Sequence, residues 1–369
     1  MRLKSGVIAR PRLSLQALLL GASVVSSGCA AFGSERLEHD QVDYARSLDR
    51  AQKRQTLSNI VSLRYADTPS FLPVTQVIAA YSFDGSASAS LTGSTIEGSG
   101  TAGTLGGSVG YSNHPTFTFT PTTGEAFAAG YIRPLAPALV LPLVQSGVPI
   151  DLLLRIVAQS IGDLQNSAAL SGADNSGSLG FFQLIHTLRR LQLKGALTVR
   201  FEQAEGGNRV FLAIDPTRSD DDAVTADART ARKLLHIADS AKEIEIVYGA
   251  VPERGAKLGI VTRSVIGILT EIGAQIEVPE ADVKAGATTP TVRLLEVETR
   301  PTIIIHVGKQ APPDAYATIA YGNGEAQQCY WIERQDFDSK FAFSVVQNLI
   351  ALAETSQNGK APIVTIPAG

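Results

Sequence analysis

Two stretches of alternating small residues, VIAAYSFDGSASASLT (residues 77–92) and TLGGSVGYSNHPTFTFT (residues 104–120), decide how this chain folds. From Tyr81 to Thr92, apolar residues and Gly occupy the odd-numbered positions, and Ser, Thr and Asp occupy the even ones. In the second stretch the odd-numbered positions again hold apolar residues, namely Leu105, Val109, Tyr111, Phe117 and Phe119. A period of two is that of a β-strand with one apolar face. Gly93 to Ala102 forms the connecting loop. We therefore predict a β-hairpin whose strands each exceed about 12 residues, against the usual length of roughly 5 or 6.

The apolar face of this hairpin is the first candidate site. Such a long hairpin is expected to project from a compact domain or to have partners along its length. One interpretation is a soluble assembly arm, whose small residues let a neighbouring subunit approach closely. The alternative is a membrane-spanning hairpin, several copies of which close an oligomeric pore or export channel. The residues that carry either role are Phe83, Ala87, Ala89, Leu91, Leu105, Val109 and Tyr111.

The first 28 residues have the pattern of a signal peptide. Four basic residues and no acidic ones lie in residues 1–12, and Leu13 to Val25 is almost entirely apolar. A transmembrane helix needs roughly 20 residues, so this apolar run is too short to span a bilayer. Secretion followed by cleavage is the expected outcome.

The cleavage region identifies the route of secretion. Ser26-Ser27-Gly28-Cys29 resembles the lipobox of bacterial lipoproteins, although the family usually has Leu at the position of Ser26. This resemblance implies cleavage before Cys29 and lipidation of that cysteine. Ala30 follows it, and the absence of Asp there implies the periplasmic face of the outer membrane. The segments SLRYADTP (62–69) and YWIERQD (330–336) are similar to parts of uncharacterised bacterial envelope lipoproteins, a resemblance that implies no activity.

Charge and cysteine content agree with this interpretation. The whole chain has 32 basic and 35 acidic residues, and removal of the signal peptide leaves 28 basic residues and a net charge near −7. Such an acidic chain is not expected to bind nucleic acid or to dock electrostatically on anionic lipids. Membrane attachment would come from the acyl chains. Once Cys29 is acylated only Cys329 remains, and we expect it to be a small buried residue rather than a nucleophile.

Outside the hairpin the sequence predicts an α+β fold with a mostly antiparallel sheet. We expect a signal peptide (1–28), a tether with an amphipathic helix from Glu35 (29–72), the hairpin (73–121), a helical segment with a linker (122–178) and an α+β domain (179–369). The helical segment includes a helix over residues 148–163. The predicted strands of the last domain span residues 195–202, 209–214, 243–248, 302–307, 318–321 and 327–332, the last two joined at Asn323-Gly324.

No catalytic, metal or cofactor motif is complete. GSGTAG (98–103) and GGSVG (106–110) fit glycine-rich patterns, but both lie in the hairpin rather than between a strand and a helix. The Asp run at 220–222 could bind a cation, although a solvated charge run is the usual explanation of such a pattern. The favoured function is therefore a non-catalytic structural or assembly subunit of an envelope complex, self-associating or binding envelope proteins through the hairpin. Besides the pore, a periplasmic hydrolase or ligand-binding protein remains an alternative, with a pocket using polar groups such as Arg155, Arg263, His306 and Asp336.

Overall fold

The computed structural model describes residues 32–355, with gaps at 73, 79–80, 93–101, 114–115, 120–121, 169–176, 205–206, 219–220, 242, 250–256, 294 and 296–299. Its sheets and helices form the predicted α+β fold. Cys29 and the signal peptide lie outside the described residues. So do the tip of the hairpin and most of the predicted linker.

The first described element is α2 (Phe32–Arg64), which confirms the predicted N-terminal helix. Residues 42–52 of this helix are exposed or only half-buried, whereas Leu57, Ile60 and Val61 are completely buried. The helix ends where Ala66 adopts a positive φ of 60°. The loop that follows is held by Asn59, whose side chain accepts from the Ser70 N–H and donates to the Ser70 carbonyl, both at 2.9 Å.

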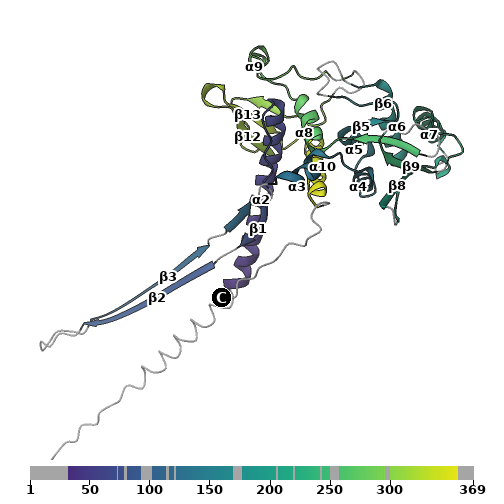
Figure 1. Cartoon of the computed structure of the whole chain (residues 1–369). Coiled ribbons are helices and arrows are strands. Elements are labelled where there is room, and N and C mark those ends of the chain that lie inside the picture. Colours follow the sequence, from purple (N-terminus) through teal and green to yellow (C-terminus); the bar gives the residue numbers. More distant parts are fainter. Residues whose placement is uncertain are drawn as a thin grey trace, which may run out of the picture.

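The predicted hairpin is divided into two successive two-stranded sheets. At its base β1 (Val74–Ile78) pairs antiparallel with β4 (Thr116–Phe119), with an irregularity between Val74 and Gln76. Beyond it β2 (Tyr81–Thr92) pairs with β3 (Ala102–Asn113). Figure 1 shows β2 and β3 extending well away from the rest of the protein.

A six-stranded sheet forms one end of the body, in the order β6-β5-β10-β9-β8-β7. Four of its five strand pairs are antiparallel and only β9–β10 is parallel, so the prediction of a mostly antiparallel sheet is confirmed. Its strands are β5 (Ala158–Ile161), β6 (Leu164–Gln165), β7 (Leu197–Ala204), β8 (Gly207–Ile214), β9 (Glu243–Tyr248) and β10 (Lys257–Thr262). The sequence interpretation missed β10, although Leu258, Ile260 and Thr262 alternate in the expected way and are buried.

The helical segment differs from our prediction. Its first part contains α3 (Gly124–Phe127), η1 (Ala128–Ile132), α4 (Pro137–Val140) and η2 (Leu141–Val144). The helix expected over residues 148–163 is wrong in its second half, because α5 (Ile150–Val157) stops and residues 158–161 become strand β5. Strands β5 and β6 therefore connect the segment 122–178 to the large sheet. The boundary at residue 178 does not separate two domains.

The remaining helices cover the sheet and join the two ends of the body. They are α6 (Leu179–Leu193), η4 (Pro216–Arg218), α7 (Asp222–Leu234), α8 (Val265–Ala274), α9 (Glu280–Lys284) and α10 (Phe337–Thr355). Helix α7 begins at Asp222 because Asp221 caps it, accepting from the Ala223 N–H at 2.9 Å. Asp221 also pairs with Lys194 at 3.2 Å. A capping role thus explains part of the Asp run.

The other end of the body carries a three-stranded antiparallel sheet in the order β11-β13-β12. It consists of β11 (His306–Gly308), β12 (Ala317–Tyr321) and β13 (Gln328–Ile332). The hairpin predicted at Asn323-Gly324 is confirmed, with a loop that contains the short helix η5 (Gly324–Ala326). The strand expected over residues 302–307 is wrong except at its end, because only His306 and Val307 of that range pair with β13.

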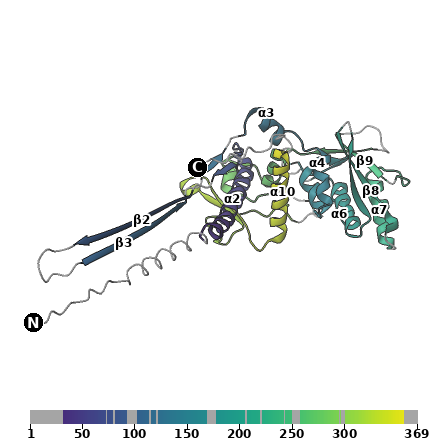
Figure 2. The same ribbon diagram turned by 90° about the horizontal axis from the view of Figure 1, so that it is seen from below.

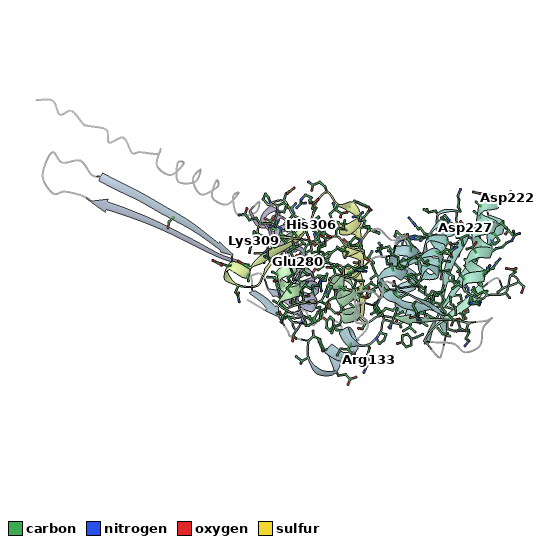
Figure 3. The ribbon with its side chains drawn as sticks, turned by 90° about the horizontal axis from the view of Figure 1, so that it is seen from above. Arg133, Asp222, Asp227, Glu280, His306 and Lys309 are labelled. Atoms are coloured by element: carbon green, nitrogen blue, oxygen red, sulfur yellow. The ribbon has the colours of Figure 1, made fainter. Side chains whose placement is uncertain are left out.

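One continuous hydrophobic core joins these parts. It includes residues of α2, the helical segment, the six-stranded sheet, the three-stranded sheet and α10. Figure 2 shows α10 between the arm side and the six-stranded sheet. In Figure 3, His306 and Lys309 lie on the part of the body nearest the hairpin, whereas Asp222 and Asp227 lie at the opposite end.

Candidate functional site: the arm and a cleft

Strands β2 and β3, here called the arm, form an uninterrupted ladder. Twelve consecutive residues of each strand pair, from Tyr81 with Asn113 to Thr92 with Ala102, without a register shift. At about 3.4 Å per residue, this ladder is about 40 Å long. It is the longest strand pair among the described residues, and it is an extended two-stranded ladder rather than a pocket.

The register of the arm brings the predicted site residues together. Odd-numbered positions of β2 oppose odd-numbered positions of β3, so that Phe83 lies opposite Tyr111 and Ala89 opposite Leu105. Alternate positions of a strand share one face of the sheet. All seven predicted arm residues therefore occupy positions on the same face, and Ser86, Ser88 and Ser90 occupy positions on the other.

The base of the arm is fixed to the body by aromatic residues that the sequence interpretation did not select. Phe71, just before β1, stacks on Tyr131 of η1 with 3.8 Å between ring centroids. The ring centroid of Phe127, in α3 just after β4, lies 6.0 Å from that of Phe71. The Tyr131 hydroxyl donates to Glu354 of α10 at 2.5 Å. The signal in the sequence was a set of aromatic residues on both flanks of the hairpin.

A second candidate site is a cleft of about 510 Å³ between α5, α6, residues 300–302 and the start of α10. This volume lies in the range of small-molecule sites. Its apolar lining includes Leu152, Ile185 and Phe341, together with Phe337, which is 69% exposed. The polar residues that line it are Asp151, Arg155, His186, Arg189, Arg300, Thr302 and Asp338.

The arginines of the cleft are held by nearby groups. Arg155 donates to the Arg300 carbonyl at 2.6 Å, and Arg189 lies 3.9 Å from Asp151. Arg300 donates to Asp338 at 2.6 Å and also to Asp336. Burial by itself would raise the pKa of Asp336, but hydrogen bonds from Ser339 and Arg300 lower it overall. The charged groups of the cleft are thus preorganised, with three arginines against two acids in a lining that is otherwise largely apolar.

The four polar groups that we proposed for a pocket are not brought together. Arg155 lines the cleft. Asp336 does not line it but forms an ion pair with Arg300, which does. His306 lies on β11, stacked on Trp331 with 5.6 Å between ring centroids. Arg263 is buried beside Glu271 and is part of the framework. Cys329 is half-buried on β13, rather than buried as expected, with its Sγ 3.6 Å from the Lys309 carbonyl.

Among the residues that the structure describes, no group of three or more His, Cys, Asp or Glu side chains is placed to hold a metal ion. No single described helix has the length and hydrophobicity needed to cross a membrane. Two helical pieces, Gly124–Ile132 and Pro137–Val144, meet the length and composition criteria only as a pair bent by 74°.

Comparison with known proteins gives no assignment. No protein-family model, no curated protein and no solved structure matches this chain.

Proposed function

We propose that this protein is a lipid-anchored, non-catalytic subunit of a bacterial cell-envelope assembly, and that its arm mediates self-association. The single observation that carries this proposal is the arm itself, with its twelve uninterrupted residue pairs extending beyond the body. An isolated two-stranded hairpin is marginally stable in water. A partner along its length would provide the missing stabilisation.

The position of α2 supports an anchored arrangement. Phe32, the first residue of α2, follows the proposed lipidation site Cys29 by only three residues. The N-terminal half of α2 and the arm leave the body on the same side (Figures 1 and 2). An outer-membrane anchor on Cys29 would therefore hold the arm on the membrane side of the body. In this arrangement, copies attached to one membrane would meet through their arms.

The proposal is tested by shortening the arm without disturbing its base. Asp84 lies opposite Gly110, so replacing residues 85–109 by Asn-Gly closes the ladder with a two-residue turn. We expect the full-length protein, extracted in detergent, to be oligomeric by light scattering, and the shortened variant to be monomeric with an unchanged circular dichroism melt. A half-length control replaces residues 89–105, between Ser88 and Gly106, by the same turn. An oligomer that survives the full replacement, or a monomeric unmodified protein, would contradict the proposal.

Ligand binding is a second candidate function, favoured by the cleft. Exposed Phe337 lines the same cleft as Arg155 and Arg189, a combination that suits a small molecule with an apolar group and a carboxylate. We expect aromatic and aliphatic carboxylates to raise the melting temperature of the native protein. The Arg155→Met and Phe337→Ala variants should lose this shift, whereas Val42→Ala, on exposed α2, should retain it. A panel of such acids that leaves the native protein unshifted would rule out this candidate.

A further inference from the structure

The arm has two free edges. Strands β2 and β3 form a sheet of their own, and within the described part of the chain neither strand pairs with another. Successive residues of a strand direct their N–H and C=O groups to opposite sides, so alternate residues of each strand direct these groups away from the hairpin partner. The arm therefore presents two rows of unpaired backbone donors and acceptors, each about 40 Å long.

These edges lack the features that normally prevent strands from pairing with other chains. Natural edge strands are protected by Lys and other charges, by Pro, by bulges or by short length. In β2 and β3, Asp84 is the sole charged residue, Pro is absent and the register has no bulge. The contrast within this protein is β7, also an edge strand. It carries Arg200 and Glu202, and Gln145 covers the Val199 carbonyl.

We infer that arms of neighbouring copies pair edge to edge, so that β2 or β3 of one copy adds a strand to the arm of the next. This inference rests on the proposed function and specifies its partner and its mode. A second copy is the favoured occupant because its arm has the same length. It also has the same alternation, so one pairing places apolar positions beside apolar positions throughout.

Membrane anchoring favours this pairing energetically. Tethered partners meet at an effective concentration set by their tether rather than by bulk solution. The arm also contributes one acidic group and no basic group, so its pairing involves little of the net negative charge of the chain. Backbone hydrogen bonds supply the affinity in strand addition, and the side-chain alternation supplies the register.

Residue-resolved amide hydrogen exchange on the full-length protein in detergent tests the inference. In a hairpin without a strand partner, protection from exchange should alternate along β2 and β3, because only inward-directed N–H groups are bonded. Edge pairing should protect consecutive residues along at least one strand of the oligomer, slowing the outward-directed amides about tenfold or more. The expected result is such consecutive protection in the oligomer and its loss, along the strand residues that remain, in the variant in which Asn-Gly replaces residues 85–109.

The outcomes separate the two proposals. An oligomer whose arm retains the alternating pattern would overturn edge pairing while leaving arm-dependent assembly intact, since the arms would then pack by their faces. A protein that remains monomeric would overturn the proposed function itself.

A second measurement uses proline substitutions at adjacent positions, which remove N–H groups directed to opposite sides of a strand. The variants are Ala87→Pro and Ser88→Pro in β2, and Ser108→Pro and Val109→Pro in β3. In each pair, one Pro removes an outward-directed N–H and the other removes an N–H that bonds within the hairpin. If arms pair edge to edge, the outward-directed variant of at least one strand should dissociate the oligomer while its hairpin remains intact.

Discussion

The Arg263 guanidinium is enclosed by backbone oxygens at the point where α5 ends. It donates to the carbonyls of Arg155 and Ile156, at 3.0 and 3.1 Å, and also to that of Ser167. Carbonyls in the last turn of a helix have no partner within the helix. Burial lowers the pKa of Arg263, and the nearby carboxylate of Glu271, 3.7 Å away, opposes this shift. Arg263 thus allows the chain to change from helix to strand without burying unpaired groups.

Removing this side chain should be strongly destabilising. In Arg263→Met, Glu271 would stay buried without its cationic partner and the Ile156 and Ser167 carbonyls would lose the guanidinium donor, while the Arg155 carbonyl would keep its bond from Asn166. We therefore expect a loss of about 3–5 kcal/mol in the free energy of unfolding. Urea denaturation measures this change. Arg200→Met, which removes an exposed pair with Glu243, is the control and should leave the transition nearly unchanged. Equal effects of the two substitutions would mean that burial of Arg263 is not what matters.

Gly177 lies where the backbone packs closely against residues 166 and 167, next to the hydrogen bonds of Arg263. Its φ is +88°, and a Cβ atom would lie 2.7 Å from the Ser167 nitrogen and 2.8 Å from the Asn166 carbonyl carbon. Backbone atoms cannot move aside as side chains do. Gly286 has a similar φ of +72° but open space around it. We expect Gly177→Ala to lower the unfolding free energy by about 1–3 kcal/mol more than Gly286→Ala, and matching melting temperatures would refute this.

At the scale of elements, α2 is one helix with two environments. Its C-terminal half packs on α8 and β12, where Gly273 of α8 lies so close that a Cβ atom would be 2.9 Å from the Ile60 carbonyl oxygen. Its N-terminal half extends along the arm side of the body (Figure 1). The helix is therefore held to the core at one end and is available for a tether at the other.

Truncations in the two halves should differ. Ile60→Ala removes a completely buried side chain and should cost about 2–5 kcal/mol. Val42→Ala, at a position 45% exposed, should change stability by less than about 0.5 kcal/mol. Chemical denaturation of both variants measures the difference. A large effect of Val42→Ala on the isolated monomer would show that this half of the helix belongs to the core.

At the scale of the whole molecule, tyrosines connect the ends of the chain. The Tyr65 hydroxyl, just after α2, donates to Asp282 of α9 and contacts the Tyr330 hydroxyl of β13, both at 2.7 Å. Tyr321 of β12 donates to Asp67. Burial, followed by these hydrogen bonds, raises the pKa of Tyr65 well above its usual value near 10. The hydrogen bond from Tyr65 to Asp282 therefore requires the protonated phenol.

This cluster predicts a loss of stability in alkali. A phenol whose pKa is raised by folding contributes its full stabilisation below the unfolded pKa of about 10, and loses it as the pH rises toward the folded pKa. The native protein should therefore be destabilised progressively above about pH 10. Tyr65→Phe should lose about 1–3 kcal/mol at neutral pH and show a shallower alkaline decline. Unfolding curves at about pH 8 and pH 11 test this, and parallel declines in the two proteins would contradict it.

The sequence by itself determined the features that depend on neighbouring residues. The period of two in residues 81–92 and 102–113 placed apolar positions on one face of the arm, because strand geometry alternates locally. The periodicity of residues 35–64 likewise determined α2. The tertiary structure alone decided that residues 158–161 leave the helix, because Arg263, about a hundred residues later, satisfies the end of α5 and β10 offers an edge. It also decided the cleft and the base of the arm, where Phe71 meets Tyr131, because such contacts join side chains that no local pattern relates.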